Sequence, residues 1–387
     1  MKDNPVDLIA ETILQGELLP AEPSLTCDDP LQREKNAVMA FLYRWRNSPH
    51  TLRRYQTEIS RLWLWSAEHD LLISQLTSLH LDLYEDFLRD PVPHDKWCSG
   101  APYPKSSPKW RPFVSGLSLT SIQNAFNAIR ALMTAWLKSG YISSDPMALK
   151  AKISASMEDG ISRSPTAPVE SADKWFDDLM APAIKQALSL MPQDTPAEFQ
   201  KAEQYRLIIR TLTVTGARVS ELVSASQSQI YEDRSGWWIR LRGKGGKIRN
   251  VPLPTDYVTE VLMPWRINHS LPAAPLQEES TPLCPPRVWI SGKKGLTSRM
   301  VLMIVKDVAA MATELLPPEA QRASKLLPRA SNHWFRHTFI TALIDRDVPT
   351  KTIMLTVGQS SEQTLRTYDH KKDQDRHDDV TRVVANL

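Results

Sequence analysis

The sequence predicts a mainly α-helical fold with a small antiparallel β-sheet (α+β), divided between two domains. Apolar residues recur with the three- and four-residue spacing of a helix face through much of the chain. One stretch instead alternates apolar and basic residues beside a Gly-rich turn, as β-hairpins do. The length of 387 residues exceeds what a single core usually accommodates, which favours two domains.

The N-terminal part begins with residues 1–32, which carry several prolines and are expected to form a loosely held leader. Residues 33–150 are expected to form a domain of four helices. The second of these follows Pro49 and carries Leu52 and Ile59 on its apolar face. The four helices are predicted over residues 34–47, about 51–63, 78–89 and 119–138, and Gly140 closes the last of them.

A Pro-rich and basic stretch separates the third and fourth predicted helices. Four prolines within residues 101–112 disfavour a helix, so an extended loop is predicted there. The loop carries Lys105, Lys109 and Arg111, which can lie along DNA, although a loop that is merely solvated is an equal alternative. Arg53 and Arg54, at the start of the second helix, form another basic group.

A linker and a second domain are expected to follow. Residues 151–172 contain Ser, Pro, Gly and Asp and have no apolar stripe, which is typical of a linker. The second domain is expected to span residues 173–387. Within it the patterns predict helices over 173–225, a β-hairpin over 237–253, a short strand over 287–290 and helices from 298 onward.

The charge balance by itself is weak evidence for a nucleic-acid partner, because Lys and Arg outnumber Asp and Glu by only 47 to 44. The distribution of the bases is better evidence, since several of them gather on the predicted hairpin. These are Arg240, Arg242, Lys244, Lys247 and Arg249.

The spacing of the cysteines and the lengths of the apolar runs indicate which kinds of protein this chain can be. Cys27, Cys98 and Cys284 are far apart and follow no metal-ligand spacing, so neither disulfides nor a zinc site is expected. The N-terminus lacks the pattern of a secretory signal, and no apolar run of about 18 residues is present. A cytoplasmic protein without a membrane span is therefore expected.

The last third of the chain places cations and a nucleophile in an order that suits phosphodiester chemistry. Guanidinium groups stay protonated and match the geometry of phosphate oxygens. A lysine can protonate a leaving oxygen, and a tyrosine hydroxyl can attack phosphorus. Neither a Walker motif nor a carboxylate pair with metal-site spacing stands out. The residues are Arg218 in Thr-Gly-Ala-Arg-Val-Ser-Glu-Leu (215–222), Lys244 in Gly-Lys-Gly-Gly-Lys (243–247), His333 and Arg336 in His-Trp-Phe-Arg-His (333–337), and Tyr368 in Leu-Arg-Thr-Tyr (365–368).

In this order the motifs resemble the tyrosine recombinase (phage-type integrase) family over about residues 205–370. The N-terminal helices, with Thr-Leu-Arg-Arg-Tyr at a helix start, resemble that family's core-binding domain, and the second domain would be the catalytic domain. The resemblance implies a site-specific DNA strand-transferase that needs no cofactor. It also implies double-stranded DNA as partner, a homotetramer on two recombination sites, a nucleoid location and accessory directionality factors.

Residue chemistry suggests how the scissile phosphate would be handled. Arg218 and Arg336 would form an electrostatic clamp on its oxygens, and Tyr368 would attack it to give a 3′-phosphotyrosyl link. His333 lies three residues before Arg336, so on a helix the two share a face. His333 would therefore hold the phosphate or transfer a proton.

Three further residues complete the expected site. The resemblance assigns Lys244, at the hairpin tip, as the general acid, with Lys247 as a rival. Gln359 stands where the family usually has histidine, and because glutamine donates hydrogen bonds but exchanges no proton at neutral pH, a positioning role is expected. Glu221 either orients Arg218 or is an ordinary acid on a helix face.

Two other functions remain open from the sequence. A type IB topoisomerase-like enzyme that relaxes DNA would use the same residue types. A DNA-binding accessory factor or repressor is the second, because Gln359 departs from the family pattern. The helical N-terminal domain and the motif spacing favour recombination. The apolar end at residues 380–387 suggests a short helix that docks on a neighbouring copy.

Overall fold

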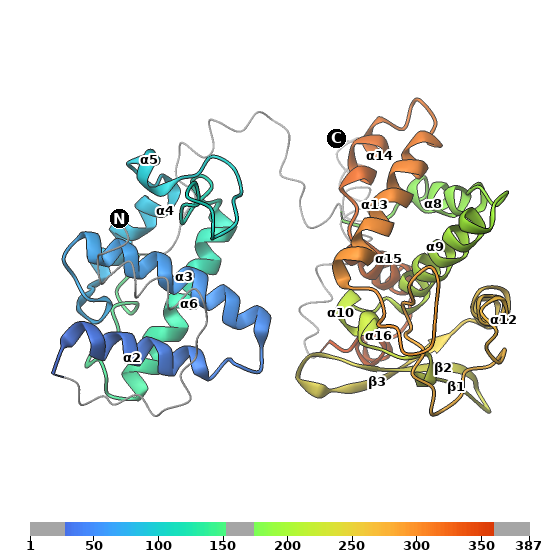
Figure 1. Cartoon of the computed structure of the whole chain (residues 1–387), viewed down its shortest axis with the longest axis horizontal. Coiled ribbons are helices and arrows are strands. Elements are labelled where there is room, and N and C mark those ends of the chain that lie inside the picture. The colour runs from blue at the N-terminus through green and yellow to red at the C-terminus, as the bar shows by residue number, and fades with distance from the viewer. Residues whose placement is uncertain (1–27, 152–173, 360–387) are drawn as a thin grey trace, which may run out of the picture. The chain divides into compact units, whose positions relative to one another are not determined.

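The computed structural model describes residues 28–151 and 174–359, except for the side chain of Lys244. The chain forms two compact units, Met1–Ser164 and Pro165–Leu387, coloured blue to teal and green to red in Figure 1. Tyr368 and the tail at residues 380–387 lie outside the described residues. Within the described ranges, no helix has the length and apolarity that crossing a bilayer requires.

The first unit is helical. Its first helix begins at Pro30, because the Asp29 side chain caps the helix by accepting a hydrogen bond from the Leu31 N–H at 3.0 Å. Residues 30–32, predicted to belong to the leader, are therefore helical. Four helices match the predicted ones, and the short α5 is additional. The unit contains α2 (Pro30–Tyr43), α3 (Pro49–Glu68), α4 (Ser78–Arg89), α5 (His94–Trp97) and α6 (Leu119–Lys138).

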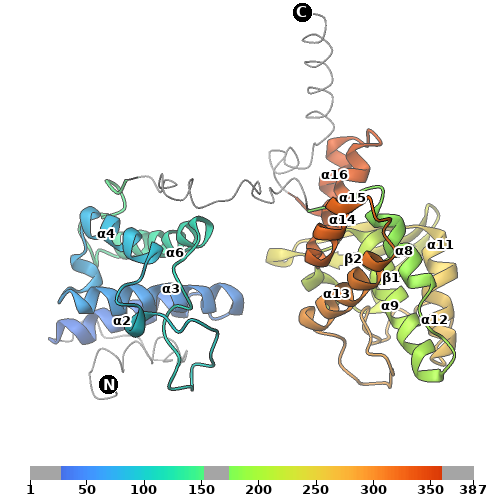
Figure 2. The same ribbon diagram turned by 90° about the horizontal axis from the view of Figure 1, so that it is seen from above.

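The core of the first unit is built from the apolar faces that the helical spacing predicts. Ile59 and Leu62 of α3 are fully buried, and so are Ile129 and Met133 of α6. Helix α6 packs against α2, α3 and α4, and Figure 2 shows the long helices α3 and α6 from above. Burial of one face on each helix supplies the main stabilisation of such a bundle.

The Pro-rich stretch between α5 and α6 forms a loop without helix or strand over residues 101–112, as predicted. An isolated bridge between Cys98 and Phe113 closes its base. Arg61 of α3 also holds this base, since its Nε and Nη2 donate to the Pro112 carbonyl at 3.0 and 2.9 Å. Its guanidinium lies 4.5 Å above the centre of the Phe113 ring.

The second unit contains a three-stranded antiparallel sheet in the order β1-β2-β3. The predicted hairpin is β2–β3, in which Arg242 pairs with Ile248 beside the turn. The first strand was not predicted, because its short run has no clear alternation. The strands are β1 (Ile230–Asp233), β2 (Gly236–Arg242) and β3 (Ile248–Leu253).

Helices pack on one face of this sheet, because alternate residues along β2 and β3 are buried while their neighbours are exposed. The second unit includes α8 (Met180–Ser189), α9 (Pro196–Thr215), α10 (Val219–Val223), α11 (Thr255–Tyr257), α12 (Met263–Asn268), α13 (Ser298–Glu314), α14 (Gln321–Leu326), α15 (Asn332–Ile344) and α16 (Thr350–Val357). Helix α9 packs against α15, and α16 packs against β3. The elements that carry the predicted catalytic motifs therefore meet within one unit.

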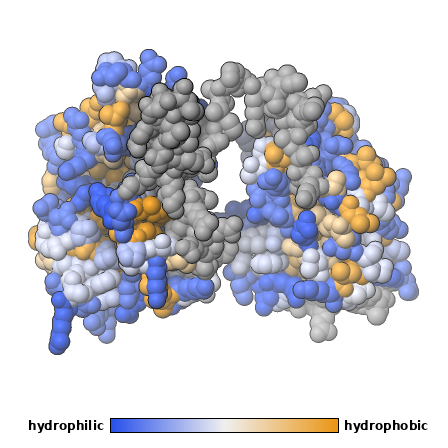
Figure 3. Space-filling model, turned by 180° about the vertical axis from the view of Figure 1, so that it is seen from behind, coloured by the Kyte–Doolittle hydropathy of each residue, from blue (hydrophilic) through white to orange (hydrophobic). Residues whose placement is uncertain are grey.

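The predicted strand over residues 287–290 is absent. Val288 and Ile290 are exposed, whereas Trp289 packs against the core. Pro285 and Pro286 precede the segment and have no N–H groups to donate to a strand ladder. The described surface seen in Figure 3 is mostly hydrophilic, with hydrophobic residues in separate patches.

Candidate active site

Arg218 is positioned by the end of α9 and the start of α10. Helix α9 is terminated by Gly216, whose φ of 52° is left-handed, and Arg218 is the N-cap of α10. Its backbone N–H donates to Glu221 Oε2 at 2.9 Å, and its Nη1 donates to Oε1 of the same carboxylate at 3.1 Å. The side chain of Arg218 is 38% exposed, so its guanidinium can also reach a ligand at the surface.

Arg336 joins the ends of two helices. Its Nη1 donates to the Gly216 carbonyl at 3.0 Å and its Nη2 to the Val357 carbonyl at 2.7 Å. Val357 is the last residue of α16, where the carbonyls lack partners within the helix and the helix dipole is negative. Arg336 is only 1% exposed, so its guanidinium is a buried cross-link between α9 and α16.

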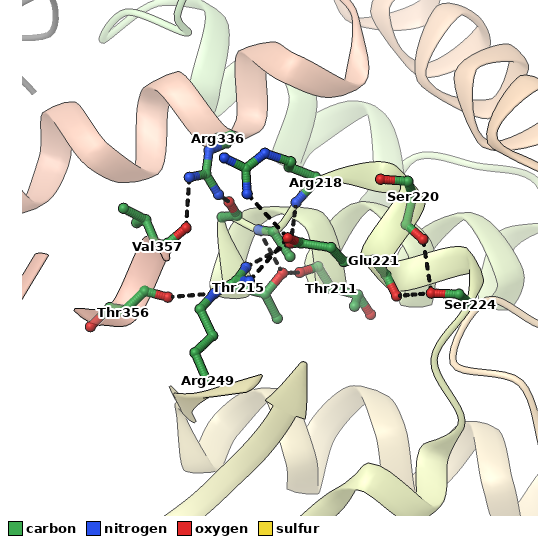
Figure 4. Close-up of polar contacts among 12 residues, drawn as sticks. Thr211, Thr215, Arg218, Ser220, Glu221, Ser224, Arg249, Arg336, Thr356 and Val357 are labelled. Atoms are coloured by element: carbon green, nitrogen blue, oxygen red, sulfur yellow. Dashed lines mark hydrogen bonds and ion pairs between the residues drawn. The ribbon is translucent and has the colours of Figure 1, made fainter. Parts of the chain in front are cut away.

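Glu221 lies at the centre of the polar network shown in Figure 4. In addition to Arg218, it accepts hydrogen bonds from Arg249 of β3, from Nη1 to Oε1 at 3.0 Å and from Nη2 to Oε2 at 2.7 Å. Burial is the largest influence on the Glu221 pKa and would raise it. The hydrogen bonds and charges of Arg249 and Arg218 outweigh burial, so the pKa lies below its ordinary value and Glu221 stays ionised.

His333 is exposed and lies one turn before the buried Arg336 on α15. Burial of part of its ring, and then the positive charges of Arg336, Arg218 and Lys174, lower the pKa of His333 below the ordinary 6.5. The imidazole is therefore neutral at pH 7 and can accept a proton. The centres of the His333 and His337 rings are 4.6 Å apart, and the rings pack edge to face. Arg336 holds the carbonyl of Gly216, two residues before Arg218, so the two guanidinium groups lie near each other (Figure 4), and His333 lies one turn before Arg336 on α15.

Gln359 follows α16 directly. The helix ends at Gly358, whose φ of 64° is left-handed, and the Gln359 N–H donates to the Met354 carbonyl at 3.2 Å. Among the residues that the structure describes, the buried Oε1 of Gln359 has no hydrogen-bond partner. Gln359 thus lies two residues beyond Val357, whose carbonyl accepts the hydrogen bond from Arg336.

The backbone of Lys244 lies in the tight turn between β2 and β3. The Gly243 N–H donates to the Lys247 carbonyl at 2.7 Å, and both Gly245 and Gly246 have positive φ. Glycines adopt this conformation readily, which explains the Gly-rich motif. Where the structure is described, no cluster of three or more His, Cys, Asp or Glu side chains could hold a metal ion.

The basic residues of the hairpin separate into two groups. Arg240, Arg242 and Lys247 are exposed, and the Arg240 guanidinium lies 5.4 Å above the centre of the Tyr231 ring. Arg249 does not belong with them, which corrects its assignment as a DNA-binding residue. Its side chain is 8% exposed and its donors are used by Glu221 and by the Thr356 carbonyl, the latter at 2.9 Å from Nε.

Similar differences separate the basic residues of the first unit. Arg53, Lys105 and Lys109 are exposed, and partial burial together with the charge of Arg53 lowers the pKa of Lys105. Arg54 is exposed, but its Nη2 donates to the Asn124 carbonyl at 2.7 Å and links α3 to α6.

Arg111, also predicted to bind DNA, shapes the loop. It donates to the backbone carbonyls of Asp95, Pro108 and Trp110 at 3.2, 3.0 and 2.8 Å. These bonds show that Arg111 holds the conformation of its own loop, and its contact with DNA stays a prediction.

The sequence interpretation did not identify Arg249 as part of the site. A signal was present, because Arg249, Val251 and Leu253 alternate along β3 and the latter two are buried. Because side chains alternate between the two faces of a strand, Arg249 lies on the same face as Val251 and Leu253. The basic residues around Arg249 suggested a surface cluster and drew attention away from this pattern.

Comparison with known proteins connects this geometry to a family. The family model described as the phage integrase family matches residues 184–375. Tyrosine recombinase XerH of Campylobacter jejuni is 28% identical, covering 43% of this chain and 40% of the relative. Tyrosine recombinase XerD of Rhizobium meliloti is 31% identical, covering 44% and 48%. The chain thus spans about half the length of these curated relatives.

The fold is similar to that of solved recombinase structures. A crystal structure of the XerH site-specific recombinase bound to a palindromic difH substrate, in a post-cleavage complex, superposes with a TM-score of 0.58 at 16% identity. The superposition covers 97% of this chain and 94% of that chain. The pre-cleavage XerH complex gives a TM-score of 0.55 at 16% identity, covering 94% and 92%.

Proposed function

Because the chain belongs to the phage integrase family, we propose that it is a site-specific tyrosine recombinase. It cleaves and rejoins duplex DNA through a 3′-phosphotyrosyl intermediate. The observation that carries the proposal is the hydrogen bond from Arg336 to the Gly216 carbonyl, which brings the helix bearing His333 and Arg336 to the segment that carries Arg218. Two guanidinium groups beside a neutral imidazole suit the charge that develops on a phosphodiester during attack.

The proposed reaction exchanges one ester bond for another. The Tyr368 oxygen bonds to phosphorus while the bond from phosphorus to the 5′ oxygen breaks. The phenol proton leaves to a base, for which neutral His333 is suited, and Lys244 protonates the departing 5′ oxygen. The 5′ hydroxyl of another strand then reverses these steps. The phosphotyrosyl link keeps the bond energy, so strand joining needs no ATP.

The two arginines contribute differently to this reaction. Arg218 is partly exposed and meets the phosphate at the surface, whereas Arg336 is buried against the Gly216 and Val357 carbonyls. We propose that DNA binding uncovers the Arg336 guanidinium and completes the clamp. Gln359, two residues beyond the Val357 carbonyl, then donates from its amide nitrogen to a phosphate oxygen.

Duplex DNA is the proposed partner, held by both domains. Residues 33–150 would form the core-binding domain and 173–387 the catalytic domain. Four copies would assemble on two recombination sites in the nucleoid, with accessory factors setting direction, and the tail at 380–387 would dock on a neighbouring copy. Exposed basic residues would contact the phosphates, namely Arg53, Arg54, Lys105, Lys109, Arg240, Arg242 and Lys247.

The proposal is tested by trapping the covalent intermediate. Nicked duplexes made from the DNA that flanks the coding sequence release a short fragment on cleavage, which prevents religation. We expect an adduct that resists SDS, and we expect digestion with nuclease and protease to locate the attached nucleotide on Tyr368. Attachment elsewhere would contradict the assigned nucleophile.

The same assay separates the other candidate functions. A duplex that is bound specifically without forming any adduct would indicate an accessory DNA-binding protein. Relaxation of supercoiled plasmids irrespective of their sequence would indicate a topoisomerase.

The exposed hairpin bases give a separate prediction about DNA affinity. Replacing Arg240 and Arg242 together by glutamine is expected to weaken binding on all sequences alike, because phosphate contacts carry no sequence information. Each lost contact should reduce the slope of log affinity against log salt by about 0.9. Fluorescence anisotropy across a salt series measures this slope.

Arg234 offers the control, since it is exposed in the β1–β2 turn, at the other end of β2 from the Gly-rich tip. Replacing Arg234 by glutamine should leave the slope unchanged. An unchanged slope in the double variant would exclude the outer face of the hairpin as a DNA contact.

A further inference from the structure

Arg249 links three of the segments that carry or adjoin predicted catalytic residues. Its Nη1 and Nη2 hold Glu221 of α10, and its Nε donates to the Thr356 carbonyl near the end of α16. Arg249 itself belongs to β3, directly after the turn that carries Lys244. The same guanidinium therefore ties the hairpin, the helix that Arg218 caps and the helix that precedes Gln359.

Two glycines show how tightly the backbone closes around this ion pair. A Cβ placed on Gly358 would lie 3.0 Å from Cδ of Arg249. A Cβ on Gly243, the residue before Lys244, would lie 3.2 Å from Glu221 Oε1 and 3.5 Å from Arg249 Nη1. The pair thus lies directly beneath both the hairpin turn and the end of α16, and a shift in the pair would displace both.

Arg249 also governs what Glu221 can do to Arg218. The Glu221 carboxylate receives both terminal nitrogens of Arg249, at 2.7 and 3.0 Å, but only one side-chain nitrogen of Arg218, at 3.1 Å. Arg218 keeps 38% of its side chain exposed. Without Arg249, the buried Glu221 carboxylate would lose two of its donors. It would then form a bidentate pair with Arg218, which would draw the Arg218 guanidinium away from the phosphate.

We propose that Arg249 is a positioning residue that holds the Glu221 carboxylate, so that Arg218 stays available to the phosphate and the turn bearing Lys244 stays fixed. The inference rests on the proposed recombinase function. It assigns to Arg249 a role in the rate of cleavage and none in DNA affinity, because its side chain is almost fully buried.

The test compares single-turnover cleavage of a nicked duplex, at saturating protein, by full-length variants. Arg249→Met is expected to lower the rate about a hundredfold, the scale on which misplaced charge stabilisation acts, while the dissociation constant for DNA is unchanged. Adding Glu221→Gln removes the competing negative charge. The double variant Glu221→Gln/Arg249→Met is therefore expected to cleave about tenfold faster than Arg249→Met.

Arg266 supplies a matched control for a purely structural effect. It is fully buried and forms a similar two-pronged pair with Glu279, at 2.6 and 2.9 Å, but it belongs to α12. Arg266→Met is expected to lower Tm as much as Arg249→Met does, yet to cleave at the wild-type rate well below that Tm.

Three outcomes would overturn the positioning role while the wild type still forms adducts. These are wild-type cleavage by Arg249→Met, a loss of DNA affinity without a loss of rate, and a loss of rate that Glu221→Gln does not relieve. If the wild type forms no adduct, the proposed function fails first, and the role of Arg249 fails with it.

Discussion

Replacing Arg336 by lysine is expected to lower the single-turnover rate of DNA cleavage by about a hundred- to a thousandfold, the effect of removing one preorganised donor from a developing charge. The reason is geometric. The guanidinium fork bridges the Gly216 and Val357 carbonyls, whereas an ammonium is a point charge that cannot span both. Because lysine keeps the positive charge, the decrease in cleavage rate reports on the arrangement of the hydrogen-bond donors.

Affinity for DNA and thermal stability distinguish the possible causes of such a loss. The dissociation constant should change little, because the exposed bases elsewhere dominate binding. Tm should fall, because the carbonyl at the end of α16 loses a buried partner. Arg346 offers a control just beyond α15, since its Nη1 donates to the Ala342 carbonyl on the exposed surface at 3.0 Å. Arg346→Lys should match the wild type, and wild-type cleavage by Arg336→Lys would contradict the clamp.

The elements whose patterns are local could be predicted from the sequence. The helices α3 and α6 and the β2–β3 hairpin follow from apolar spacing alone, because one face of each must be buried. The glycines at the hairpin tip likewise follow from the conformation of a tight turn. These features depend on neighbouring residues, which a single sequence contains.

The connections between elements could not be predicted in the same way. Residues 287–290 have the local pattern of a strand, but in the described part of the chain no strand pairs with them. Arg249 and Arg111 were assigned to DNA because bases cluster around them, and only the folded chain reveals the carboxylate and the carbonyls that engage them. A basic residue's role depends on what lies opposite it, and that partner can be far away in the sequence.

The candidate site shows the same division. Arg218, Arg336 and His333 were predicted from their motifs, and their catalytic roles stay predictions. The structure adds the hydrogen bond by which Arg336 holds the Gly216 carbonyl, two residues before Arg218. The sequence left open whether Glu221 orients Arg218 or is an ordinary surface acid. Its burial and its hydrogen bonds to Arg218 favour the first reading.

The contact between the end of α9 and helix α15 leads to a second prediction with a large effect. Gly216→Ala is expected to lower the free energy of unfolding of the second unit by about 3 kcal/mol, from backbone strain and overpacking together. The φ of Gly216 is 52°, and a Cβ there would lie 2.4 Å from Cδ1 of Phe339. Phe339 lies on α15, one turn after Arg336, so the clash also pushes the guanidinium away from its acceptor on residue 216.

The matched variant is Gly292→Ala, because Gly292 has a φ of 83° but no atom within 4 Å of its Cβ position. Gly292→Ala is expected to lower the free energy of unfolding by about 1 kcal/mol, because it introduces the strain of a left-handed alanine but no clash. Urea denaturation followed by tryptophan fluorescence measures both variants. Equal decreases in the free energy of unfolding for the two variants would mean that Phe339 moves aside freely. If the packing is as tight as these distances indicate, Gly216→Ala also cleaves DNA more slowly at temperatures where it is fully folded, because the Arg336 cross-link sets the positions of both helix ends.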